Sequence, residues 1–167
     1  LPGDRFRDIN WKVSGRLSEL ITRISPITQE RTTILPVAFR NVRSSAAAVA
    51  DGREAVAHLD VLKSWLLAFL RTVKQEHPEM QFRLSTAEDS RLLESAEDIE
   101  RFAAELAGLF YQRESTGGFA EPAQSTGQLF VFSTPFDRGL GRYLSAQGAG
   151  SICLFRTRAP GADGNGA

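Results

Sequence analysis

The fold class of this chain is decided by the stretch Gln128-Leu129-Phe130-Val131-Phe132-Ser133-Thr134-Pro135-Phe136-Asp137. Its unbroken apolar run is typical of a strand that is covered on both faces, as in a parallel sheet. The residues from Thr134 to Asp137 then supply a hydroxyl cap, a proline at the first helical position and a carboxylate two residues later. The stretch therefore predicts a buried strand that leads into a helix beginning at Pro135.

A second, weaker copy of this pattern occurs earlier in the chain. The residues Phe82-Arg83-Leu84 are followed by Ser85-Thr86-Ala87-Glu88-Asp89, which repeats the order of strand, Ser-Thr, two residues and Asp. This copy predicts a short strand over residues 80–85 and a long helix from Thr86 to about Arg113. Two such joints indicate an α/β layer architecture, although about ten residues are too few to indicate a duplication.

The remaining elements follow from hydrophobic spacing. The strongest helix signal covers Asp51–Gln75, a further strand is expected over Ser151–Thr157, and the helix from Pro135 should end near Ala146. The residues 31–42 are rich in β-branched and aromatic side chains, but Pro36 removes a ladder donor. This segment is therefore expected to be an edge strand, or a strand that begins after the proline.

The N-terminal segment Asn10–Ile24 is expected to be an amphipathic helix outside the regular alternation of strands and helices. Its apolar side chains recur at three- and four-residue spacing: Trp11, Leu17, Leu20, Ile21 and Ile24. Its basic side chains lie roughly opposite that stripe, which is typical of a surface helix, so nucleic-acid binding is disfavoured.

Together these patterns predict an α/β fold with a four- or five-stranded, mostly parallel sheet flanked by helices. The strands around Phe82, Val131 and Leu154 are expected at its centre. Residues 1–158 are expected to form a single domain, because 167 residues are enough for one substantial core. The glycine-rich residues 159–167 are expected to be a flexible tail.

Composition excludes several classes of function. The formal net charge is zero, which disfavours bulk nucleic acid and anionic membranes as partners. No apolar stretch is free enough of charge to span a membrane, and the chain is expected to be soluble and cytoplasmic. Cys153 is the only cysteine and there are two histidines, so no Cys/His metal site and no cofactor are predicted. Cys153 itself is expected to be a buried, unreactive thiol.

Candidate ligand-binding residues gather where the predicted strands end. In open α/β sheets, ligands bind beyond the carboxyl ends of the strands. The helix expected at Pro135 would add free N–H groups, and two arginines one turn apart would add positive charge. The candidates are Ser85, Thr86, Ser133, Thr134, Asp137, Arg138 and Arg142. The competing interpretation is that Thr134 and Asp137 only cap the helix and that the arginines form an exposed face.

The sequence does not decide whether the protein is an enzyme, because no nucleophile elbow, phosphate loop or spaced set of metal ligands is present. The function expected from this pattern is a non-catalytic regulatory, binding or assembly module that acts through protein–protein contacts, with a protein partner or a homo-oligomer. The alternative is binding of an anionic or phosphorylated small ligand, or catalysis, at the joint formed by residues 133–142.

Overall fold

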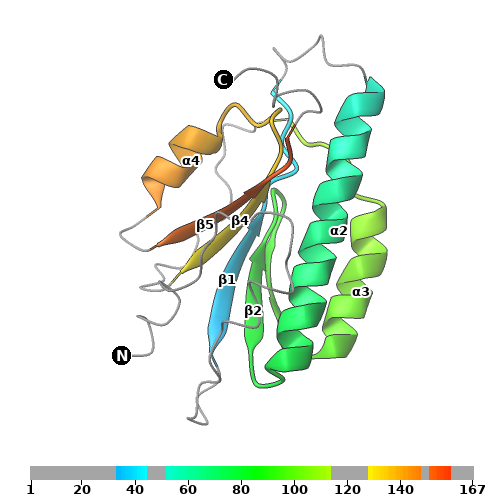
Figure 1. The fold of residues 1–167 in the computed structure, drawn as a ribbon, viewed down its shortest axis with the longest axis vertical. Helices are drawn as coiled ribbons and strands as arrows, with labels where there is room; N and C mark the ends of the chain where they lie inside the picture. Colours follow the sequence, from blue (N-terminus) through cyan, green and yellow to red (C-terminus); the bar gives the residue numbers. More distant parts are fainter. Residues whose placement is uncertain (1–32, 45–51, 114–127, 148–150, 159–167) are drawn as a thin grey trace, which may run out of the picture.

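A computed structural model describes residues 33–44, 52–113, 128–147 and 151–158, and these residues form a mixed five-stranded sheet with helices on both faces (Figure 1). The strands are β1 (Ile34–Phe39), β2 (Gln81–Ser85), β3 (Ser90–Leu93), β4 (Leu129–Ser133) and β5 (Ile152–Arg156). The helices are α2 (Gly52–Glu76), α3 (Ala96–Ala107) and α4 (Leu140–Ala146). The predicted N-terminal helix at 10–24, most of the loop before Gln128 and the tail at 159–167 lie outside the described residues.

The strands lie in the order β3-β2-β1-β4-β5. β1 pairs in parallel with β2 and with β4, and β4 pairs in parallel with β5, whereas β3 is antiparallel to β2. The α/β class and the strands at β2, β4 and β5 are therefore as predicted. The chain steps from β1 to β2 on one side and later returns to place β4 on the other side of β1, so β1 and β4 flank the point where the strand order reverses.

Both alternatives predicted for the proline-containing segment are wrong, because β1 is the central strand of the sheet and begins at Ile34, before Pro36. The Thr33 carbonyl accepts from the Gln81 N–H of β2, while the Arg40 N–H donates to Phe132 of β4. Alternate residues of a strand bond to opposite neighbours, so Pro36 faces β4. The β1–β4 ladder begins only at Val37. The missing donor of Pro36 therefore falls before that ladder starts, and Leu154 lies on the edge strand β5 rather than at the centre.

The predicted helix from Thr86 to Arg113 is also wrong over its first ten residues and after Ala107, because α3 covers only Ala96–Ala107. Residues Thr86 to Asp89 form a tight turn, in which the Thr86 N–H donates to the Asp89 carbonyl at 2.8 Å. The chain then returns as the edge strand β3 before α3 begins. The helix start is at Ser95, whose hydroxyl accepts from the Asp98 N–H while the Asp98 carboxylate accepts from the Ser95 N–H. This capping box satisfies N–H groups that the helix leaves free.

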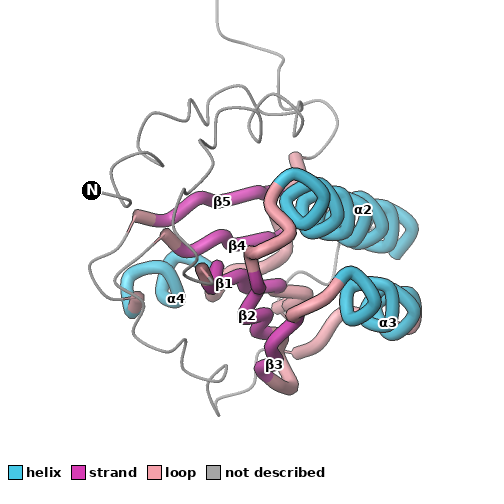
Figure 2. Tube along the Cα trace, turned by 90° about the horizontal axis from the view of Figure 1, so that it is seen from below, coloured by secondary structure: helices cyan, strands magenta, loops and turns pink. Residues whose placement is uncertain are grey.

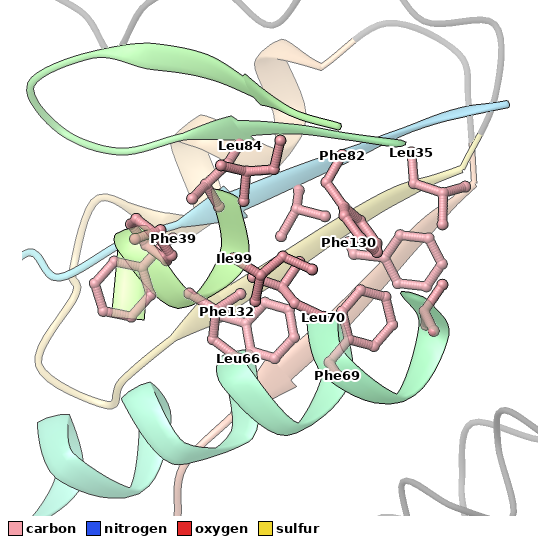
Figure 3. Close-up of a cluster of buried hydrophobic side chains, with 14 of the residues drawn as sticks. Leu35, Phe39, Leu66, Phe69, Leu70, Phe82, Leu84, Ile99, Phe130 and Phe132 are labelled. Carbon is pink, nitrogen blue, oxygen red and sulfur yellow. The ribbon is translucent and has the colours of Figure 1, made fainter. Parts of the chain in front are cut away.

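The main core lies between the sheet and the helices α2 and α3. α2 contributes one apolar side, and the predicted helix at 51–75 is confirmed. Figure 3 shows the Phe69 ring of α2 among the aromatic rings of the sheet, where its centroid lies 4.9 Å from that of Phe130 and 5.6 Å from that of Phe132. A smaller core lies beneath α4 on the opposite face, formed by Ala38, Leu129, Val131 and Leu140. Among the described helices, none combines the length and the apolar content needed to cross a bilayer.

Candidate functional site

The candidate site lies at the carboxyl ends of β1 and β4, where the strand order reverses. In doubly wound sheets this is the place where ligands bind. β1 ends in Phe39 and continues into Arg40 and Asn41, while β4 ends in Ser133 and continues into Thr134. The sequence analysis had identified the β4 side of this point but not the β1 side.

A buried ion pair occupies the space between these two strand ends. The Arg40 side chain donates from Nε to Asp137 Oδ2 at 2.6 Å and from Nη2 to Asp137 Oδ1 at 3.0 Å. The exposed fraction is 2% for the Arg40 side chain and zero for that of Asp137. The Ser133 hydroxyl donates to the same Oδ2 at 3.0 Å, and the Arg40 guanidinium lies 4.2 Å from the centre of the Tyr143 ring. A two-point pair of this kind fixes both groups in direction as well as distance.

Local sequence explains how Asp137 reaches this position. Two consecutive turns follow β4, in which Asp137 N–H donates to Thr134 O and Leu140 N–H donates to Asp137 O. The helix α4 therefore begins at Leu140 instead of Pro135, and its N-cap Gly139 makes no side-chain capping bond. The predicted helix start at Pro135 is wrong because the Asp137 carboxylate bonds to Arg40 of the neighbouring strand rather than to N–H groups of its own turn.

The candidate residues predicted from the sequence fall into three groups. Ser133, Thr134 and Asp137 are buried together at the end of β4, whereas Arg138 and Arg142 are exposed. Ser85 and Thr86 end β2, which β1 separates from β4. Since neighbouring strands are about 4.8 Å apart, this pair lies roughly 10 Å from the β4 end. The structure therefore brings the β4 residues together and leaves the β2 residues outside the group.

A histidine missed by the sequence analysis packs against Phe136, the residue before Asp137. His58 of α2 is buried, with Nδ1 2.8 Å from the Thr157 hydroxyl and Nε2 3.8 Å from Glu54 Oε1. Its ring meets the Phe136 ring edge-on at a centroid distance of 5.3 Å. His58 and Thr157 are 99 positions apart, so only the folded chain could reveal this contact.

Two tyrosines contact residues of the site, Tyr143 at Arg40 and Tyr111 at Thr134. Burial raises the pKa of Tyr143, and the neighbouring Arg40 partly opposes that change. Burial likewise raises the pKa of Tyr111, which hydrogen-bonds to Thr134 and donates to the Ala55 carbonyl at 2.7 Å. Both phenols are therefore kept protonated at neutral pH, and both act as hydrogen-bond donors or ring surfaces rather than as bases.

Asn41, which follows β1, has a buried acceptor left unsatisfied. Its Nδ2 donates to the Phe110 carbonyl at 2.5 Å, while its Oδ1 has no hydrogen-bond partner among the described residues. A buried acceptor without a donor is costly, so such an atom marks a place where a donor from another molecule would be favourable.

Cys153 and the acidic residues supply no further chemistry here. Cys153 is buried in β5, and burial raises the pKa of its thiol to about 12, as expected for an unreactive cysteine. Among the described residues, no group of three or more His, Cys, Asp or Glu side chains is placed to hold a metal ion.

No family model matches the chain, and no curated protein or solved structure is significantly similar to it. The function must therefore be argued from the described residues themselves.

Proposed function

We propose that this chain is a non-catalytic assembly module that acts through protein–protein contacts, and that its partner is a second copy of the same chain. The observation that carries the proposal is the contrast between the two edges of the sheet. β3 is short and carries Arg91, which is held by Asp89 at 2.7 Å and by Glu105 at 2.5 Å. Charged groups of this kind protect an edge strand from pairing with another chain.

β5 carries one charged side chain, the exposed Arg156 at its last position, and its other exposed side chains are apolar. β5 is the edge strand on its side of the sheet, and its side chains Ile152 and Leu154 are 36% and 41% exposed. An open apolar strand edge is a template for pairing with another strand. If two copies pair antiparallel about Leu154, Leu154 meets itself and Ile152 lies opposite Arg156 of the second copy. No like charges oppose one another in this register, and a two-fold contact of this kind closes on itself.

The Arg40–Asp137 pair supports the non-catalytic part of the proposal. A catalytic acid or base must lie within hydrogen-bond reach of the proton that it transfers to or from a substrate. Asp137 instead accepts from Arg40 and Ser133 in a buried position. The two charged groups at the strand ends are thus bound to one another, as expected of residues that hold loops in place.

The test is the molar mass in solution, measured by size-exclusion chromatography with light scattering over a wide range of protein concentration. We expect a dimer for the wild-type chain and a monomer for Leu154→Lys, because a lysine on an edge strand opposes pairing. Val61→Lys is the matched control, since Val61 is an apolar residue of α2 with a similar exposed fraction of 42%. A wild-type monomer at every concentration, or equal dimerisation of all three proteins, would exclude this assembly.

The alternative function is binding of an anionic or phosphorylated ligand at residues 133–142, with or without catalysis. Asn41 is the observation that favours it, because its unsatisfied Oδ1 would accept from a ligand that carries a hydroxyl or amine donor. Arg138 and Arg142 are exposed and would supply charge-assisted hydrogen bonds to the anion. The short helix α4 adds no N-terminal anion site, since it begins only at Leu140.

A thermal-shift series with phosphate and nucleotides tests this alternative. One-site binding at a hundred times the Kd stabilises a protein by about 2.7 kcal/mol. The shift should disappear in Arg138→Ala and persist in Arg113→Ala, a control that removes an exposed arginine outside the joint. No shift with any anion, or an equal shift in both variants, would exclude ligand binding at this joint.

A further inference from the structure

Within the described residues, the two faces of the sheet are covered unequally. α2 and α3 lie side by side on one face, whereas α4 lies alone on the other (Figure 2). The side chains beneath α4 come from β1 and β4, namely Ala38, Leu129 and Val131. One described helix therefore serves a face of the same width that two helices cover on the opposite side.

The width of the sheet shows how much of that face α4 leaves open. Five strands at spacings of about 4.8 Å span roughly 19 Å, and a helix with its side chains is about 10 Å wide. A helix over β1 and β4 therefore leaves β2 and β3 uncovered on one side of α4 and β5 on the other side.

The side chains on the β2 and β3 side of α4 are partly apolar and partly exposed. We define the β1–β3 strip as the residues Ile34, Pro36, Gln81, Arg83 and Leu92. In the strand registers, Ile34 is opposite Gln81, Pro36 is opposite Arg83, and Arg83 is opposite Leu92. All five alternate with neighbours buried beneath α2 and α3, so they face the α4 side. Ile34 is 41% exposed and Leu92 is 40% exposed.

We infer that the β1–β3 strip is the docking site of the N-terminal segment Asn10–Ile24 of this chain, bound as a helix through its apolar stripe. A helix of fifteen residues is about 22 Å long, and a strand of six residues such as β1 is about 20 Å long. One such helix therefore matches the strip in length. A stripe that recurs every three to four residues must be buried for the helix to be stable, because isolated helices of this length are marginal in water.

Chain connectivity permits this arrangement. Only nine residues separate Ile24 from Ile34, and an extended chain covers up to about 3.3 Å per residue. The ten steps from Ile24 to Ile34 therefore reach about 33 Å, which exceeds the length of the strip. Because Ile34 is itself part of the strip, the chain enters the sheet at the edge of its own docking site. The inference is independent of the proposed dimer, since β5 lies on the far side of α4.

Disulfide crosslinking in the full chain tests the inference directly. Leu92→Cys is combined in turn with Leu17→Cys, Leu20→Cys and Ile21→Cys. The matched control places the second cysteine at Ala104, which is exposed on α3 and therefore on the opposite face of the sheet. Cys153 is left unchanged because it is buried and held as a thiol. After mild oxidation, we expect a disulfide within the monomer for at least one Leu92 pair and for none of the Ala104 pairs.

Two outcomes would overturn the inference. Crosslinking of the Leu92 pairs no faster than the Ala104 pairs would show that the segment does not dock on the strip. Crosslinking that yields only dimers would show that the strip receives the segment of a second copy rather than its own. Mass spectrometry of the unreduced products distinguishes these cases from the disulfide within one chain.

A double-mutant cycle gives a second readout that does not depend on cysteine geometry. Leu92→Asp should lower the urea midpoint in the wild-type chain and have little further effect in a Leu20→Asp background, because both changes disrupt the same contact. Val61→Asp on α2 is the control and should lower the midpoint equally in both backgrounds. Full additivity of Leu20→Asp and Leu92→Asp would contradict docking on this strip.

Discussion

The two Ser-Thr-x-x-Asp joints of this chain share a pattern but have different structures. After β2, Thr86 and Asp89 bond to each other across a tight turn, with Thr86 Oγ1 donating to Asp89 Oδ1 at 3.0 Å. After β4, the Asp137 side chain leaves its own turn and bonds to Arg40, 97 positions away. The same local pattern can therefore form either a local turn or a long-range ion pair. Which of the two forms depends on whether the neighbouring strand places an oppositely charged side chain within reach of the aspartate.

The strongest test of this comparison is to neutralise each aspartate in turn. Asp137→Asn should lower the free energy of unfolding by about 3–5 kcal/mol, because it leaves Arg40 buried without its charged partner. Asp89→Asn should cost at most about 1 kcal/mol, because Asp89 is partly exposed and its salt bridge to Arg91 is screened by solvent. Urea denaturation of the two variants measures both values. Similar costs would show that Asp137 contributes no more to stability than Asp89 does.

Replacing the whole ion pair sharpens the same point. Arg40→Met combined with Asp137→Leu should lose at least about 2 kcal/mol less than Asp137→Asn alone, because removing both charges leaves no uncompensated ion in the core. The control is Arg40→Met by itself, which should be costly because Asp137 then remains buried and charged. If the double variant is no more stable than either single variant, the pair has a role beyond mutual neutralisation.

Replacing the first serine of each joint by alanine should cost different amounts of stability, but the difference should be smaller than for the aspartates. Ser133→Ala removes a buried hydrogen bond of 3.0 Å to Asp137 and should cost about 1 kcal/mol. Ser85→Ala removes only a long contact of 3.5 Å to the Ser90 hydroxyl, so its cost should be within about 0.5 kcal/mol. Thermal and urea unfolding of both variants provide the comparison, and equal costs would contradict the assignment of Ser133 to the ion-pair cluster.

The smallest effect concerns a related but shorter pattern, Ser95-Ala96-Glu97-Asp98, in which a hydroxyl residue and an aspartate three positions later cap a helix. Hydrogen bonds from Ser95 and Glu94 lower the pKa of Asp98. A carboxyl whose pKa is lowered by folding stabilises the protein above its unfolded pKa, and this contribution is lost as the pH falls through the folded value. The stability difference between wild type and Asp98→Asn should therefore shrink below about pH 4.

An NMR titration checks this last prediction independently of unfolding. The pKa of Asp98 should rise toward its ordinary value in Ser95→Ala, since the cap hydroxyl and its ordered N–H groups hold the charged form. An unchanged pKa in that variant would show that the capping box does not control this carboxylate.

Sequence patterns were sufficient wherever local chemistry decides the structure. The apolar run Leu129–Phe132 and the broad apolar face of α2 allow few alternatives, so both elements were predicted at nearly their observed limits. Sequence patterns were insufficient where a residue far away in the sequence decides the local structure. Nothing near Pro36 shows that the β1–β4 ladder begins one residue later, and nothing near Asp137 reveals Arg40.

The same reasoning applies to the candidate site. Ser133, Thr134 and Asp137 could be identified because polar residues at the end of a buried strand are uncommon, and Arg40-Asn41 after Phe39 carries the same signal on β1. That signal was obscured by the proline, which suggested an edge strand. His58 and Tyr143 carry no comparable sequence signal, because each lies on a helix and joins the group only through tertiary packing.

The position of β1 at the sheet centre has a consequence for synthesis of the protein on the ribosome. β1 can pair with β2 once residue 85 has emerged, but its other side waits for β4, about 48 residues later. At synthesis rates of about 5–20 residues per second, this delay is roughly 2–10 s. For that time the nascent chain presents an unpaired apolar strand edge, and Arg40 has no Asp137 to bind. The nascent chain is therefore expected to need a chaperone most during this interval, before β4 has been translated.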